Sequence, residues 1–92
     1  MTDHDDNTVF VGKKGTMAYV LAVITQINQG ANIVLVKARG KAISRALDVV
    51  EIVRNKFDTS LKLENIGIST EEVLTEEGQP IKVSAIEITL KK

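Results

Sequence analysis

Apolar residues recur along the chain with two different spacings, and each spacing predicts a type of element. A β-branched and aromatic run over residues 8–11 predicts a first strand. Residues 17–28 carry apolar side chains at helical spacing, with Thr16 placed to cap the helix and Gly30 placed to end it in a left-handed conformation. The opposite side of this helix is apolar too, and so small a domain has too few residues to cover both sides, so we expect a homodimer interface near it.

The remaining apolar runs predict a second helix and three more strands. A continuous apolar run over residues 33–36 predicts a central strand covered on both faces, and a helical stripe predicts a helix over residues 42–57. In the last third of the chain, apolar and polar residues alternate in two stretches. This pattern predicts a hairpin with residues 69–80 as its long, acidic and mobile tip. The alternation slips near residues 63–66 and 83–86, which indicates a bulge or bend that turns the outer half of the hairpin away from the body.

This order of elements, β-α-β-α-β-β, predicts an α+β fold of two layers, in which two helices pack against one sheet that ends in a long C-terminal β-hairpin. The chain of 92 residues suffices for one domain with a modest core, which we place at residues 8–92. Residues 1–7 are polar and acidic and are predicted to form a disordered tail unlike a signal peptide. No apolar run reaches the roughly 18 residues of a membrane span, so we expect a cytoplasmic protein with no membrane partner.

The residue types that catalysis needs are nearly absent. The chain has no cysteine and a single histidine, His4, in the predicted tail, so neither a zinc site nor a nucleophilic triad can be assembled. The acidic pairs Glu71–Glu72 and Glu76–Glu77 fall on the predicted hairpin tip, where solvated charges are the ordinary interpretation. We therefore expect no enzymatic activity, no metal site and no cofactor. Only three residues are aromatic, which argues against base-stacking platforms for single strands.

The basic residues are concentrated in one half of the chain, although the formal net charge is zero. Residues 12–45 contain six basic residues and no acidic one. Most of them lie in two glycine-containing turns, at 12–15 and 37–41, where glycine permits a close approach of the backbone and the start of a helix favours an anion. Parallel strands would bring both turns to one edge of the sheet. This pattern predicts contacts with nucleic-acid phosphates by Lys13, Lys14, Lys37, Arg39, Lys41 and Arg45. Solvated surface charges are the alternative interpretation.

Five stretches of the chain form a recognisable pattern. They are VGKK at 11–14, M-x-YVLA at 17–22, KARGKAIS at 37–44, EIVRNKF at 51–57 and VSAIEI at 83–88. In order and spacing they closely resemble the Alba family of archaeal chromatin proteins, from about Val9 to the C-terminus. The resemblance implies a homodimer that binds double-stranded DNA, and also RNA, largely without sequence preference, and that is associated with the chromosome and contributes to its compaction.

The resemblance also implies roles for single residues. Lys13 would be the lysine that the family uses for regulatory acetylation. Phe57 would be the phenylalanine through which family dimers meet side by side on DNA, while its helical spacing places it equally well in the core. Gly15 and Ala18 stand where the family usually has Pro and Asn, so we expect a more flexible loop that lacks one polar side chain.

Two further departures from the family pattern concern charge. Lys41 replaces the commoner arginine, so that a point charge replaces a bidentate fork. At the hairpin tip Gly78-Gln79 replaces the usual Gly-Arg beside acidic residues, and because the family's arm reaches toward the minor groove, we expect weaker binding than is usual in the family. Two alternatives remain open at this point. One is RNA as the main partner, and the other is a protein-interaction module that uses the acidic tip and tail.

Overall fold

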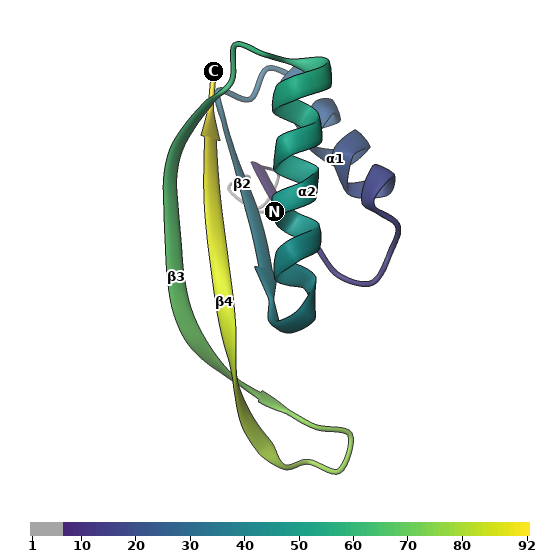
Figure 1. The fold of residues 1–92 in the computed structure, drawn as a ribbon, viewed down its shortest axis with the longest axis vertical. Coiled ribbons are helices and arrows are strands. Elements are labelled where there is room, and N and C mark those ends of the chain that lie inside the picture. The colour runs from purple at the N-terminus through teal and green to yellow at the C-terminus, as the bar shows by residue number, and fades with distance from the viewer. Residues whose placement is uncertain (1–6) are drawn as a thin grey trace.

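Four strands form one mixed sheet, and two helices pack on one of its faces (Figure 1). The computed structural model describes residues 7–92, so nearly all of the predicted tail over residues 1–7 lies outside the described residues. The predicted α+β order is confirmed. The elements are β1 (Thr8–Phe10), α1 (Thr16–Asn28), β2 (Ile33–Arg39), the 3-10 turn η2 (Gly40–Ala42), α2 (Ile43–Ile52), the π-helical turn η3 (Val53–Phe57), β3 (Lys62–Leu74) and β4 (Pro80–Lys91).

The strand order in the sheet is β1-β2-β4-β3, with β1 and β2 parallel and the other pairs antiparallel. Because β1 and β2 are parallel, the loops that follow them leave from the same end of the sheet. Beyond the end of β2 at Arg39, strands β3 and β4 continue as a two-stranded arm that curves beneath the helices (Figure 1). The loops and the root of this arm therefore share one end of the molecule.

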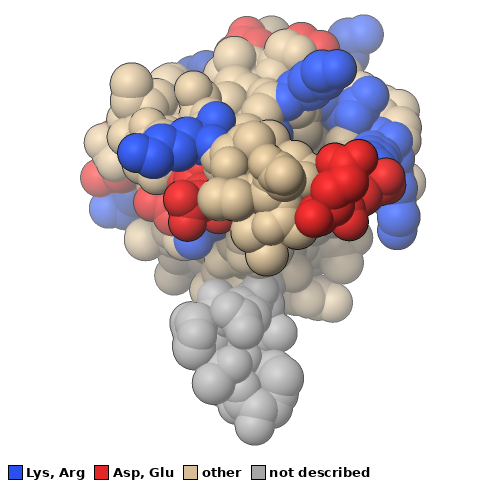
Figure 2. Space-filling view, turned by 90° about the horizontal axis from the view of Figure 1, so that it is seen from below, with Lys and Arg blue, Asp and Glu red and all other residues tan. Residues whose placement is uncertain are grey.

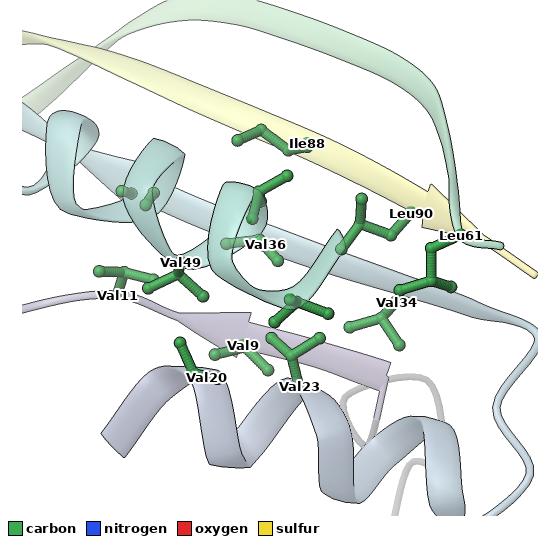
Figure 3. Packing of buried hydrophobic residues seen from close by; sticks show 14 of the residues in the cluster. Val9, Val11, Val20, Val23, Val34, Val36, Val49, Leu61, Ile88 and Leu90 are labelled. Carbon is green, nitrogen blue, oxygen red and sulfur yellow. The ribbon is translucent and has the colours of Figure 1, made fainter. Parts of the chain in front are cut away.

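The core lies between the helices and the inner face of the sheet and is built almost entirely from aliphatic side chains (Figure 3). Alternate residues of β2 and β4 point into it, β1 contributes Val9, and α1 and α2 each contribute one stripe, whereas β3 has no buried residue. Burial of one such side chain stabilises the fold by about 1.5–3 kcal/mol. The largest fully buried side chains are Ile88, Leu90, Val20, Val23, Val34, Val36, Val49 and Val53.

Strand β2 is central in the sheet, but the predicted cover on both of its faces is wrong. Val34 and Val36 are buried under the helices, whereas Ile33 is exposed and Leu35 is half-buried on the other face. No second layer lies on that outer face among residues 7–92 (Figure 1). Leu35 is only half-buried at its outward position, where its register partners on the neighbouring strands are Thr8 and Thr89.

Of the two predicted ends of α1, the C-terminal end is confirmed and the N-terminal cap is wrong. The predicted cap by Thr16 is wrong, because Gly15 occupies the N-cap with extended dihedrals (φ −64°, ψ 153°) and Thr16 is already the first helical residue. Gly30 ends the helix as predicted, with a φ of 100°. The backbone N–H groups of Gly30 and Ala31 donate to carbonyls of the last turn at 3.0 and 3.1 Å, which completes a Schellman motif.

The hairpin tip is much shorter than the predicted segment over residues 69–80. Residues 69–74 pair with residues 80–85, so only Thr75–Gln79 form the turn. The N–H of Gly78 donates to the carbonyl of Thr75 at 2.9 Å, and Gly78 takes the positive φ of 80° that closes the turn. Much of the predicted tip is therefore paired strand.

The two slips in the hairpin pattern have different causes. The slip in β3 is a register shift between Leu63 and Asn65, which acts as a β-bulge. The slip near residues 83–86 in β4 is not a bulge, since β4 pairs with β3 without a shift there. It falls where β2 ends opposite Ala85, so that β4 changes from a central strand of the body to one strand of the arm.

Candidate nucleic-acid interface

The two basic turns meet at the end of the sheet where the parallel strands β1 and β2 finish. The loop over residues 11–15 follows β1, and η2 follows β2. An open groove at this end runs between the turns and the root of the arm. Five of the predicted contact residues line it, and Lys14 is exposed beside Lys13 in the same loop. The lining residues are Lys13, Lys37, Arg39, Lys41 and Arg45.

The loop between β1 and α1 is held by two hydrogen bonds. The backbone N–H of Lys14 donates to the hydroxyl of Tyr19 at 3.0 Å. The guanidinium Nη1 of Arg45 donates to the carbonyl of Gly12 at 2.5 Å. A Cβ at Gly12 would lie 3.4 Å from the hydroxyl oxygen of Tyr19, so glycine also permits a close approach. These contacts fix the backbone while the side chains of Lys13 and Lys14 remain exposed.

Arg45 therefore has a contact that the sequence did not indicate. It is partly buried, and it connects the first turn of α2 to the loop that follows β1. This hydrogen bond positions the backbone that carries Lys13 and Lys14. Tyr19 has the same kind of role from α1, because its ring packs against the core and its hydroxyl reaches the loop.

Two of the predicted cations are ion-paired with carboxylates from the hairpin. Nζ of Lys37 lies 3.1 Å from Oε2 of Glu87, and Nη1 of Arg39 lies 3.2 Å from Oε1 of Glu71. All four side chains are more than a third exposed, so each pair is screened by solvent and contributes about 0–1 kcal/mol. A phosphate can therefore displace either carboxylate at little cost, although each carboxylate lowers the positive potential of the groove.

The outer face of the sheet carries one exposed aromatic residue next to these cations. Phe10 is 68% exposed, and Nζ of Lys37 lies 5.8 Å from the centroid of its ring. Lys37 and Phe10 are partners in the register of β2 and β1. This neighbourhood could not be predicted, because a strand of three residues is too short to show which of its side chains faces the core.

Basic and acidic groups alternate over this end of the molecule, as Figure 2 shows in a view onto the arm and the turns. The sequence predicted Glu71 on the solvated hairpin tip, yet Glu71 and Glu87 lie against the cations. Within residues 7–92 no group of three or more acidic, histidine or cysteine side chains is arranged to hold a metal ion. None of the described helices is long and apolar enough to cross a membrane.

Large apolar side chains are exposed in two further places. Phe57, at the end of η3, is 52% exposed, so it is not the last core residue of its helix. On the edge strand β3 a row of exposed apolar residues lies on the same face of the sheet as the helices, and α2 carries one exposed leucine. We call these residues the β3 apolar surface: Leu47, Leu63, Ile66 and Ile68.

Fold and site together define a small α+β domain that presents two basic turns at the carboxyl ends of two parallel strands. The family model for Alba matches residues 7–70, and the chain belongs to the Alba family. It is 54% identical over 88 residues to "DNA/RNA-binding protein Alba" of Methanocella arvoryzae, covering 96% of this chain and 92% of the relative. It is 56% identical over 87 residues to "DNA/RNA-binding protein Alba 1" of Archaeoglobus fulgidus, covering 95% and 97%.

The fold is likewise similar to solved members of the family. The structure of Alba from Thermoplasma volcanium superposes with a TM-score of 0.89 at 55% identity, covering 94% of this chain and all of that one. A more distant relative, ALBA1 from Trypanosoma brucei, superposes with a TM-score of 0.76 at 27% identity, covering 95% of this chain and 69% of that one. The arrangement of the strands and helices is therefore that of the family.

Proposed function

We propose that this protein is a non-enzymatic chromatin protein that binds double-stranded DNA, and also RNA, through backbone phosphates with little sequence preference. The observation that carries the proposal is the convergence of the two basic turns on one end of the sheet. The similarity to two relatives that are named as DNA/RNA-binding proteins supports it. On this proposal the protein contributes to chromosome compaction and is cytoplasmic and chromosome-associated.

The chemistry of the interface favours backbone contacts over base reading. Lys13, Lys14 and Lys41 supply mobile point charges on turns, and Arg39 supplies a planar fork that suits a phosphate. Each phosphate that is neutralised releases counterions, which makes the affinity fall with salt. Among the described residues that line the groove there are lysines and arginines but no asparagine or glutamine to read base edges, so we expect little discrimination between sequences.

The proposed working form is a homodimer, which would double the number of basic turns. The sequence placed the interface near α1, whose exposed apolar residues in the structure are Met17, Ala18 and Leu21. The β3 apolar surface is the larger exposed set, and Leu63, Ile66 and Ile68 follow one another along the edge strand. We therefore move the proposed dimer interface to the β3 apolar surface, where a second copy would exclude water from both edges.

Two residue roles complete the proposal. Phe57 would make the contact between neighbouring dimers on DNA, which its exposure at the end of η3 supports. Lys13 would be the acetylation site, because it is exposed in a loop and acetylation would remove a charge from the groove. Mass spectrometry of the protein purified from its source tests the second role directly.

The function is tested by measuring the affinity for several unrelated duplexes at moderate salt. We expect Lys14→Ala and Arg39→Ala to weaken binding to all of them by similar factors. The matched control is Lys56→Ala, which removes an exposed lysine from the opposite end of α2, in η3. A loss of affinity for one duplex sequence alone would contradict binding without sequence preference. If the protein bound none of the duplexes, a protein-interaction module would be the better account.

RNA as the main partner is the second candidate, because the relatives are named as binding RNA as well as DNA. Competition between duplex DNA and duplex RNA of equal length separates the two candidates. Preferential retention of the DNA supports the chromatin role, and preferential retention of the RNA supports the second candidate.

A further inference from the structure

One row of side chains crosses the outer face of the sheet, on the side away from the helices. Phe10 of β1 is in register with Lys37 of β2, Lys37 with Glu87 of β4, and Glu87 with Gly67 of β3. The row therefore presents an aromatic ring, a cation, a carboxylate and a residue without a side chain. Phe10 faces outward because its neighbour Val9 is buried in the core (Figure 3).

The part of the open groove that continues onto this face has a low floor. Gly67, Ser69 and Ala85 are small residues on the same side of β3 and β4, and they line the groove together with Phe10 and Lys37. Small side chains in the floor and an exposed ring at the rim leave room for a flat group. A solitary exposed phenylalanine is ordinary on a protein surface, but this one borders a basic groove.

We propose that the outer face around Phe10 is a stacking site for one unpaired nucleobase, so that the protein prefers nucleic acid with a bulged base to a fully paired duplex. This inference rests on the proposed function, because the basic turns must first bind the flanking backbone. Every base has a π-face, so the site would select an unpaired base and not a particular sequence. A single ring provides one stacking position and no platform for a continuous single strand.

The contacts of Lys37 fit this use. Its ammonium group lies 5.8 Å from the ring centroid and 3.1 Å from Glu87, so it can leave the exposed carboxylate for the phosphate of the stacked nucleotide. Glu87, once released, can accept hydrogen bonds from amino groups of the base. The ring, the cation and the carboxylate would then contact three different parts of one nucleotide.

The test compares a fully paired RNA duplex with the same duplex that carries one unpaired 2-aminopurine, together with the two DNA equivalents. For the wild-type protein we expect about tenfold tighter binding of the bulged probe and quenching of its fluorescence by stacking. Phe10→Leu keeps the apolar bulk but removes the π-face, so it should abolish the preference and the quenching while changing the affinity for the paired probe by less than about twofold. The RNA and DNA probes show which kind of backbone the site accepts.

The controls separate this inference from the proposed function. Ile33→Ala removes another exposed apolar side chain from the same face, at the far end of β2, and should leave the preference intact. Lys14→Ala should lower the affinity for the bulged and the paired probe by the same factor. Retained preference or quenching in Phe10→Leu overturns the stacking site alone, whereas failure of the wild type to bind either probe overturns the proposed function as well. A shift of the monomer–dimer equilibrium by Phe10→Leu in sedimentation would assign the ring to a protein interface and would also overturn the inference.

Discussion

The hydroxyl of Tyr19 accepts a hydrogen bond of 3.0 Å from the backbone N–H of Lys14. Helix α1 therefore holds the loop that leads into it, and the two exposed lysines of that loop project from a fixed backbone. A fixed loop loses less conformational entropy when it binds than a mobile one. This contact and the hydrogen bond from Arg45 restrain the loop, and so they act against the greater flexibility expected from Gly15.

Tyr19→Phe tests the role of that hydrogen bond. The ring still packs against the core, but the N–H of Lys14 loses its partner. We expect the free energy of unfolding in urea to fall by about 0.5–1.5 kcal/mol and the affinity for duplex DNA to fall by a few-fold, because the lysines are less well positioned. Unchanged affinity, with the expected loss of stability, would show that the loop does not need to be fixed.

Glu71→Gln tests whether the hairpin carboxylates weaken the interface. Removing this charge frees Arg39 from its ion pair of 3.2 Å, so we expect the affinity for duplex DNA to rise by up to about fivefold at low salt. Glu72→Gln is the matched control, because the same charge is removed from the opposite face of β3. Isothermal titration of both variants measures the difference, and an equal rise in the two would mean that net charge and not the pair with Arg39 is responsible.

Gly15→Pro tests the conformation of the N-cap of α1. Gly15 has a φ of −64°, which proline adopts without strain, and a Cβ there would meet nothing within 4 Å. We expect a stabilisation of about 0.4–1 kcal/mol, seen as a higher midpoint in thermal unfolding. Gly30→Ala is the contrasting variant, because its φ of 100° strains any side chain, and it should lower the midpoint.

Ile66→Gln tests the dimer interface on the β3 apolar surface. Ile66 is exposed in the single subunit, so the change should leave the fold intact while it places an amide in the middle of the proposed contact. Sedimentation velocity should show a shift from dimer to monomer. Leu21→Gln makes the same kind of change on α1, and a shift to monomer in that variant alone would return the interface to α1.

The sequence predicted the order of elements and the position of the basic turns for simple physical reasons. Helical and alternating spacings are local, so α1, α2 and the hairpin are visible in the residues themselves. The convergence of Lys13 and Arg39 followed from a parallel β-α-β unit, which the structure contains.

Side-chain neighbours that depend on strand register could not be predicted. A single shift between Leu63 and Asn65 sets which residues of β3 lie opposite β4, and no local pattern gives its position. The pairing of Glu71 with Arg39 and the place of Gly67 in the row that contains Phe10 both follow from that register. Helical spacing does not show what the hydroxyl of Tyr19 contacts, so its hydrogen bond with the loop was not predicted.

The salt dependence of duplex affinity is the most direct test of phosphate recognition by the basic turns. For the wild-type protein the logarithm of the binding constant should fall linearly with the logarithm of the salt concentration, with a slope of about −0.9 for each phosphate contacted. The double variant Lys13→Ala with Lys14→Ala should bind more weakly, with a slope less steep by up to about 1.8. An affinity that does not change with salt, or a double variant that keeps the wild-type slope, would contradict the account.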